Sequence, residues 1–282
     1  MKELILDYAR LFYRTFRFLL RALQRNVPPK IACYIQNVFL VLHRSNLKYS
    51  YDKKNSLYIA HQDGLVRYFG DMDRGFDLYA RCMIARGHKI ANSYCLQNLN
   101  FNSQDIIIDC GANYGDLYIY FSDKIKKSNY IAFEPGPVEF KCLQNSMPNS
   151  RIYNLALSDS DGELDFYLCS KTGDSSLIEP KTYTEVIKVD VRSMDSFLPD
   201  LNIDKCKLFK IEAEGLEPEI LNGSRDFIKI CEYIAIDGGR ERGVNAEATL
   251  HKASNFLLRN GFEMIDINGK VYRALYKNCF LS

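Results

Sequence analysis

The sequence predicts an α/β fold built around a doubly wound, mostly parallel β-sheet. From Asp105 onward, short apolar segments alternate with segments of helical periodicity. The apolar segments have the length and composition of parallel strands that are buried on both faces, and a turn between two glycines follows the first of them. The 282 residues, 47% of them hydrophobic and 26% charged, are enough for one large domain with an appendage.

The first expected element is a basic amphipathic helix over residues 1–27. Residues 1–30 hold seven Lys or Arg against two acids, a net charge of +5, which leaves −3 for the rest of the chain. Its charged residues recur every three or four positions and would share one stripe of a helix: Glu3, Asp7, Arg10, Arg14, Arg17, Arg21 and Arg25. Such a helix suits peripheral contact with an anionic membrane. Packing against the chain's own domain, or against a second subunit of a homodimer, is the open alternative.

Two further observations bear on location. The nine cysteines include no C-x-x-C pair and no His/Cys spacing typical of zinc, which indicates reduced thiols. The longest apolar run without charge, residues 31–42, is too short to span a membrane, and arginines interrupt any signal-peptide core. We therefore expect a cytoplasmic protein, which the N-terminal helix would hold at the inner face of the cytoplasmic membrane if that helix binds lipid.

The remaining elements follow from breaks in the pattern. Pro28 and Pro29 end the first helix, a second helix is expected over 31–44, a hairpin over 57–69 that turns at Asp63-Gly64, and a helix over 75–96. The expected strands are 105–109, 130–134, 151–156, 207–212, 233–237, 262–267 and 271–276, the last two forming an edge hairpin. The helices between them are expected at 115–126, 138–146, 217–230 and 246–259. These elements suggest three parts, 1–48, 49–99 and 100–282.

The turn after the first expected strand is the clearest candidate for a binding site. Asp109 ends the strand, Gly111 and Gly115 bracket the turn, and a helix begins at once, which is where open α/β sheets bind nucleotide-like ligands. The spacing D-x-G-x-x-x-G matches neither the G-x-G-x-x-G of dinucleotide sites nor a P-loop. An acid before the first glycine suits a ligand with an amino group, such as the methionine end of S-adenosylmethionine.

A second acid supports the same ligand. Glu134 closes the next strand, 25 residues after Asp109, where an acid in nucleotide-binding α/β domains accepts the ribose hydroxyls. Each feature alone is also explained by a helix cap or a solvated turn. Because both occur in order and at this separation, we predict nucleotide binding.

Five motifs extend the case and resemble those of the FkbM-type methyltransferases, a class I family that depends on S-adenosylmethionine. They are DCGANYGD (109–116), AFEPGPVEFKCLQNS (132–146), NLALSDSDGELDFY (154–167), SSL (175–177) and KIEAEGLEPEIL (210–221). The resemblance implies a Rossmann-like seven-stranded sheet in the third part, preceded by a helical and hairpin extension. It also implies O-methylation of a sugar or another hydroxylated metabolite.

The resemblance also implies roles for individual residues. The methionine moiety would contact the turn (Asp109, Gly111, Ala112, Asn113 and Gly115), Glu134 would hold the ribose, and Ala156 and Leu157 would lie near adenine. The chain departs from the family pattern at Glu212, where the family has Asp, and at Asp237, where it tends to have Glu.

Acidic side chains at the ends of the fourth and fifth strands are the catalytic candidates. A sugar hydroxyl needs a base to remove its proton during methyl transfer, and Glu214, Glu212 and Asp237 are placed to supply one, with Glu214 the first choice. Glu217 follows one helical turn later, and we expect Lys210 to pair with one of these acids. The acids could instead hold a divalent cation that activates the hydroxyl, and the metal requirement is unknown.

The sequence therefore predicts an S-adenosylmethionine-dependent O-methyltransferase acting on a sugar of a surface glycan, or on a lipid-linked or nucleotide sugar, in polysaccharide biosynthesis. The alternatives are a methyltransferase of a non-sugar metabolite and a scaffold that binds the cofactor without catalysis, because altered acids can mark lost activity. The glycine spacing disfavours a nicotinamide oxidoreductase. Nucleic acid is not an expected partner, because the catalytic part is net acidic and lacks an N/D-P-P-Y motif.

Overall fold

The computed structural model describes residues 18–42, 45–80, 82–169 and 174–281. Two compact units divide the chain, Met1–Met83 and Ile84–Ser282. We had placed the divisions after residues 48 and 99. The difference arises because Tyr94 and Leu96 are buried in a core of the second unit, so the segment before residue 99 belongs to it. None of the helices in the described ranges is both long and apolar enough to cross a membrane.

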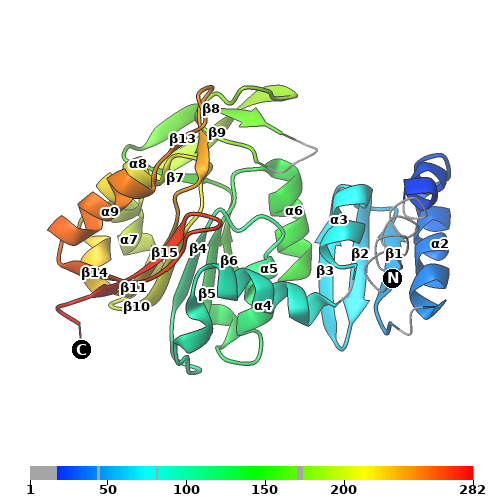
Figure 1. The fold of residues 1–282 in the computed structure, drawn as a ribbon, viewed down its shortest axis with the longest axis horizontal. Coiled ribbons are helices and arrows are strands. Elements are labelled where there is room, and N and C mark those ends of the chain that lie inside the picture. The colour runs from blue at the N-terminus through cyan, green and yellow to red at the C-terminus, as the bar shows by residue number, and fades with distance from the viewer. Residues whose placement is uncertain (1–17, 43–44, 81, 170–173, 282) are drawn as a thin grey trace, which may run out of the picture. The chain divides into compact units, whose positions relative to one another are not determined.

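The first unit combines helices with a small antiparallel sheet (Figure 1). Residues 18–25 are helical and precede α2 (Pro29–Leu42), which is followed by β1 (Lys48–Asp52), β2 (Leu57–Gln62), β3 (Leu65–Phe69) and α3 (Met72–Leu78). The hairpin predicted over 57–69 is confirmed: it turns at Asp63 (φ 50°) and Gly64 (φ 81°), the left-handed pair of a tight turn. Of the N-terminal helix predicted over 1–27, residues 1–17 lie outside the part of the chain that the structure describes.

The single helix predicted over 75–96 is wrong. The segment forms the end of α3, then α4 (Met83–Ser93), then the short 3₁₀ helix η1 (Leu96–Asn98). Asp71 caps the start of α3 by accepting from Arg74 N–H, and Tyr79 closes its end. The first N–H of α4, on Met83, donates to the Gln62 side chain at 2.6 Å, so a new helix starts there.

The second unit is built on a seven-stranded sheet of order β14-β15-β11-β10-β4-β5-β6 (Figure 1). The strands are β4 (Ile107–Cys110), β5 (Tyr130–Phe133), β6 (Arg151–Tyr153), β10 (Cys206–Ile211), β11 (Cys231–Asp237), β14 (Phe262–Asn268) and β15 (Arg273–Asn278). All neighbours pair in parallel except β15, which runs antiparallel to both β11 and β14. The predicted doubly wound sheet and its closing hairpin are confirmed, with the last strand inserted between β11 and β14.

Each face of this sheet packs on its own helices. Successive residues of a strand enter opposite cores, so Ile108 contacts one cluster and Ile107 the other. The first cluster joins the sheet to α7 (Met194–Leu201), α8 (Glu217–Asn222), η3 (Phe227–Ile230) and α9 (Leu250–Arg259). The second joins it to α4, α5 (Asp116–Phe121) and α6 (Pro137–Ser146); η2 (Lys127–Asn129) precedes β5. The continuous apolar composition of the strands follows from this double burial.

Several predicted boundaries are wrong. The expected strand 151–156 splits into β6 and β7 (Ala156–Ser158), and β7 joins a separate sheet of order β7-β9-β8 with β8 (Gly162–Leu168) and β9 (Glu185–Ser193). The expected helix 217–230 stops at Asn222, and Gly223 follows as its C-cap; a Cβ on Gly223 would lie 2.1 Å from Ser158 O. The helix expected at 115–126 ends at Phe121. The helix expected at 246–259 begins only at Leu250, because residues 247–248 form β13 (Glu247–Ala248), which pairs with β12 (Arg240–Arg242) in a small hairpin.

Candidate active site

The candidate site lies at the edge of the sheet where β4, β5, β10 and β11 end. These four strands are parallel neighbours, so their carboxyl ends share one edge. The loops that follow them carry the residues singled out in the sequence, with Gly111–Gly115 after β4, Glu134 after β5, Glu212–Glu214 after β10, and Asp237 closing β11.

The turn after β4 needs glycine for two separate reasons. Gly111 (φ 73°), Asn113 (φ 52°) and Gly115 (φ 80°) all adopt left-handed backbone angles. A Cβ on Gly111 would also lie 1.9 Å from the backbone oxygen of Glu212, which brings the turn against the end of β10. The N–H groups of Gly111 and Ala112 both donate to Phe133 O, at 3.0 and 3.1 Å. The turn is therefore fixed to both neighbouring strands.

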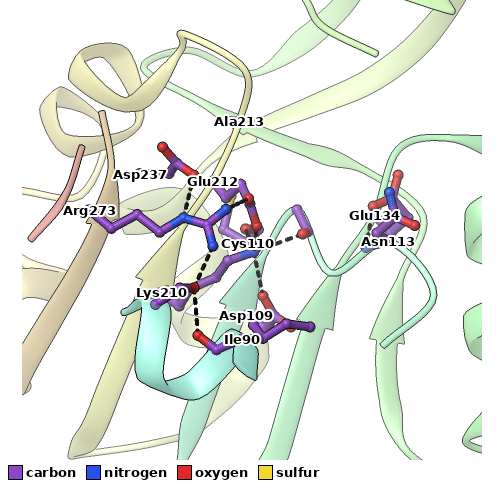
Figure 2. A network of polar contacts seen from close by, with 12 residues as sticks. Ile90, Asp109, Cys110, Asn113, Glu134, Lys210, Glu212, Ala213, Asp237 and Arg273 are labelled. Atoms are coloured by element: carbon purple, nitrogen blue, oxygen red, sulfur yellow. Dashed lines mark hydrogen bonds and ion pairs between the residues drawn. The ribbon is translucent and has the colours of Figure 1, made fainter. Parts of the chain in front are cut away.

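Glu134 joins the turn after β4 to the turn after β5. One carboxylate oxygen accepts from Asn113 N–H at 2.7 Å (Figure 2). The other accepts from Gly136 N–H at 2.8 Å. The residue is only 6% exposed, and burial, aided by the charge of Glu139, raises its pKa to about 7. Each oxygen takes one backbone donor, which leaves acceptor capacity on both. The structure thus brings together Glu134 and Asn113, both predicted cofactor contacts.

Asp109 has a different environment from the one we expected. The side chain is 1% exposed; one oxygen pairs with Lys210 Nζ at 2.9 Å, and the other accepts from the Tyr130 hydroxyl. Both oxygens thus bind protein groups. A direct contact between Asp109 and a ligand amino group stays a prediction.

Lys210 links the end of β4 and its turn to the loop after β10. Its Nζ lies 2.9 Å from Asp109, 3.0 Å from Glu212, 3.0 Å from Cys110 O and 2.8 Å from Gly111 O (Figure 2). Burial disfavours the charge of this lysine, but Asp109 and Glu212 outweigh burial and raise its pKa above the ordinary value. The predicted pairing of Lys210 with a strand-end acid is confirmed.

Arg273, which the sequence did not single out, binds two of the three catalytic candidates. From the first position of β15 its guanidinium reaches Glu212 at 2.5 Å and Asp237 at 2.6 Å (Figure 2). It also donates to Ser93 Oγ at 2.5 Å and lies over the ring of Tyr94, 4.3 Å from the centroid. Arg273 therefore connects the ends of β10 and β11 to the residues that close α4.

The acids differ in charge because their partners differ. Burial would raise the pKa of Glu212, but Lys210 and Arg273 lower it to about 2, so this carboxylate is ionised at neutral pH. Burial and the charge of Glu212 raise the pKa of Asp237 to about 6, although Arg273 opposes them. Burial together with the charge of Glu241 raises the pKa of Glu214 to about 10. Within the described residues, neither Glu214 nor Glu241 has an ion pair with a lysine or arginine.

A dedicated set of contacts holds the backbone that carries Glu214. Glu214 itself is left-handed (φ 50°), and its carbonyl accepts from the Ser176 hydroxyl at 3.0 Å. Arg242 donates to Gly215 O at 2.6 Å while binding Glu219 with both of its terminal nitrogens. The strained turn is therefore held at two successive carbonyls.

Glu217 supports this turn by accepting three hydrogen bonds from protein groups. It is 1% exposed and accepts from Ala213 N–H (3.0 Å), Gly215 N–H (3.1 Å) and the Thr249 hydroxyl (2.7 Å). The residue thus orders the loop that presents Glu214.

The contacts described so far do not include the predicted adenine neighbours or a metal site. Ala156 and Leu157 lie in β7 with their side chains in hydrophobic clusters, and their proximity to adenine stays a prediction. In the part of the chain that the structure describes, no group of three His, Cys, Asp or Glu side chains is arranged to hold a metal ion.

Comparison with known proteins identifies a family for this region. A model described as "Methyltransferase FkbM domain" matches residues 109–264. The chain is 26% identical over 157 residues to "Methyltransferase 1" of Beauveria bassiana, covering 47% of this chain and 63% of that protein. It is 24% identical over 148 residues to "2-O-methyltransferase NoeI" of Sinorhizobium fredii, covering 46% and 61%. The chain thus spans less than two thirds of the length of these curated relatives.

Among solved structures, the chain is similar to a methyltransferase FkbM from Methylobacillus flagellatus. The two share 18% identity with a TM-score of 0.44, over 72% of this chain and 52% of that one.

Proposed function

The chain belongs to the methyltransferase FkbM domain family, and on that premise we propose that it is an S-adenosylmethionine-dependent O-methyltransferase acting on a sugar hydroxyl. The observation that carries the proposal is the joining of the β4 and β5 turns by Glu134 and Asn113, 2.7 Å apart, beside a group of strand-end acids. The printed name of one relative, a 2-O-methyltransferase, supports transfer to oxygen.

The residues present fit the cofactor. Glu134 keeps acceptor capacity for two ribose hydroxyls, and its bond to Asn113 N–H holds the left-handed turn of Gly111, Asn113 and Gly115 beside it. Among the described residues, Asp109, Glu212 and Asp237 pair with two cations, Lys210 and Arg273, whereas Glu214 and Glu241 have no ion pair with a lysine or arginine. These acids suit a cationic ligand, whose charge would favour their ionised forms. When bound, S-adenosylmethionine supplies a methyl group on a positively charged sulfonium.

Glu214 is the residue we assign as general base. Its carboxyl has no cationic partner among the described residues, whereas Glu212 and Asp237 are occupied by Arg273. The acceptor oxygen would form its bond to the methyl carbon as the carbon–sulfur bond breaks, and Glu214 would take the hydroxyl proton. A raised pKa makes a carboxylate a stronger base, and the positive charge of a bound sulfonium lowers that pKa toward neutrality.

Glu212 and Asp237 act in this proposal as fixed acceptors for neighbouring hydroxyls. Arg273 holds both at 2.5–2.6 Å, so they need no reorganisation when the acceptor binds. The same negative charge disfavours an acceptor that carries a phosphate near the reacting hydroxyl. A neutral sugar within a glycan, or in a lipid-linked chain away from its phosphates, therefore fits better than a nucleotide sugar.

The test measures binding first and chemistry second. Calorimetry with S-adenosylhomocysteine is expected to give one site per chain, which Glu134→Ala weakens and the exposed control Glu163→Ala leaves unchanged. Incubation with methyl-labelled S-adenosylmethionine and glycan extracts should then place label in neutral saccharides. Absence of S-adenosylhomocysteine binding would refute the cofactor assignment, and label in phosphorylated sugars only would refute the acceptor class.

A further inference from the structure

The first unit presents an apolar face to solvent. Along α2 the exposed large side chains recur at helical spacing, with exposed fractions between 46% and 75%: Ile31, Tyr34, Val38, Val41 and Leu42. The preceding helix, residues 18–25, adds Phe18, Leu19 and Leu23, each more than half exposed. Eight large apolar residues on two consecutive helices exceed the scattered exposure that is ordinary on a protein surface.

Several polar residues of these two helices bind other parts of the same unit. Arg21 binds Asp77 at 3.0 Å and lies over the ring of Phe76, and Arg25 binds Asp73 at 2.6 Å. Gln24 donates to Gln36 of α2 at 3.0 Å, and both glutamines are buried. These contacts tie the helices to α3 and to each other through their polar sides. These polar groups therefore serve contacts within the unit, while the large apolar side chains of the same helices stay exposed.

We propose that this face, defined by Phe18, Leu19, Leu23, Ile31, Tyr34, Val38, Val41 and Leu42, docks on the surface of an anionic phospholipid membrane. The net positive charge of residues 1–30 favours a membrane over a second copy of the chain as the partner of this face. Once Arg21 and Arg25 are paired with α3, residues 1–30 still contain five Lys or Arg against two acids, a net charge of +3. A homodimer through this face would bring two such segments together, whereas anionic headgroups neutralise them.

The mode of contact is interfacial. The outward apolar side chains would enter the boundary between headgroups and acyl chains while the basic residues bind the headgroups. This inference is independent of methyl transfer, and its test contains no activity measurement.

The experiment uses the full-length chain and vesicles of phosphatidylcholine with or without 30–40% phosphatidylglycerol, roughly the anionic fraction at which polybasic segments bind measurably. The unmodified protein is expected to sediment with the anionic vesicles, less so as salt rises, and not with neutral ones. Val38→Asn/Val41→Asn, which keeps helix propensity nearly constant, should reduce the partition coefficient at least ~10-fold. The matched control Val244→Asn/Leu258→Asn replaces equally exposed apolar residues of the second unit and should bind like the unmodified protein.

Three results would overturn the proposal. The first is an unmodified protein that stays in the supernatant with anionic vesicles at low salt, a reading that does not depend on any variant. The second is an α2 variant that binds vesicles as the control does. The third is light scattering that shows a dimer for the unmodified protein and a monomer for the α2 variant, which would assign the face to a second copy.

Discussion

Arg273 binds Glu212 at 2.5 Å, although 61 residues of chain and the whole of β11 separate them. The same guanidinium holds Asp237 at the end of β11, so a single cation binds two carboxylates from different strands, and Lys210 adds a second cation beside Glu212. Like charges placed this close would otherwise repel, and both are largely removed from water. The charge balance of the candidate site therefore depends on a residue that we assign no chemical step.

Replacing Arg273 by Met should destabilise the protein by about 3–5 kcal/mol at pH 8, the usual cost of leaving buried partners uncompensated. The loss should be smaller at pH 5, because the unpaired carboxyls can then be protonated. In the unmodified protein, Glu212 makes stability depend on pH in the opposite direction. Its pKa is lowered to about 2, so its ionised form stabilises the fold above the ordinary carboxyl range, and this stability is lost as pH falls toward 2. Urea unfolding at both pH values measures the difference.

Arg192→Met is the matched control for this variant. Arg192 also lies over an aromatic ring, Phe197, and pairs with Asp200 at 2.7 Å, but on a more exposed surface. Its removal should cost less than about 1 kcal/mol with little dependence on pH. Equal losses in the two variants would contradict the role given to Arg273.

Glu214→Gln should lower the rate of methyl transfer by ~10²-fold or more while leaving S-adenosylhomocysteine affinity unchanged, because the amide cannot accept the proton. Single-turnover rates with saturating cofactor report the chemical step directly. Glu247→Gln, an exposed change on the nearby β13, serves as control. Full activity in Glu214→Gln would transfer the base role to Glu212 or Asp237.

Glu241→Gln should move the acid limb of the pH–rate profile to lower pH by roughly one unit. After burial, the charge of Glu241 is the largest influence that raises the pKa of Glu214, so neutralising it makes Glu214 ionise more readily. The measurement is kcat/KM between pH 5 and 10. A limb that stays in place would mean that Glu214 is not the group whose ionisation controls the rate.

Binding of S-adenosylhomocysteine should tighten as pH rises from 6 to 8. The pKa of Glu134 is raised to about 7, and the form that accepts two ribose hydroxyls is the carboxylate, which gains population as pH rises. Glu134→Gln should abolish this dependence, and Glu134→Ala should weaken binding ~30-fold or more, equivalent to ~2–4 kcal/mol. Calorimetry at three pH values tests both. A dependence that persists in Glu134→Gln would point to another titrating group.

Gly111→Ala should destabilise the protein much more than Gly243→Ala. Both glycines are left-handed (φ 73° and 66°), so both substitutions carry the backbone strain of about 1–2 kcal/mol. Only at Gly111 would the new Cβ also collide with Glu212 O, at 1.9 Å; at Gly243 the nearest atom is 3.5 Å away. Thermal unfolding in parallel separates the two effects. Similar melting temperatures would show that the turn can move away from β10.

The parts of the site that the sequence predicted are those encoded locally. Gly111, Asn113 and Glu134 stand immediately after short apolar strands, and parallel pairing then brings them to the same edge. The partners of Arg273 lie 36, 61 and 180 residues away, and an arginine in a closing strand has no neighbouring residue that marks its role. Its position could be predicted only with the strand order already known.

The errors in the fold have similar causes. The run 151–156 looks like one strand, but the Asn154 side chain donates to Glu134 O and Pro135 O and interrupts it. The residues of β8 are mostly exposed, so they lack the apolar pattern of a buried strand. Gly223, which follows α8, packs closely on Ser158, a contact between distant segments. Contacts between distant segments and the degree of burial thus override the local pattern.

The insertion of β15 between β11 and β14 has a consequence for folding kinetics. β14 precedes β15 in the chain, yet it has no pairing with β11 in the finished sheet, so the strands cannot be added in the order in which they are synthesised. An intermediate that has assembled β4, β10 and β11 exposes the open edge of β11 and leaves Glu212 and Asp237 without Arg273. Closure must wait until β15 pairs with β11, whether before β14 or together with it as a hairpin. Completion of the sheet and neutralisation of its acidic edge would thus be the same kinetic event.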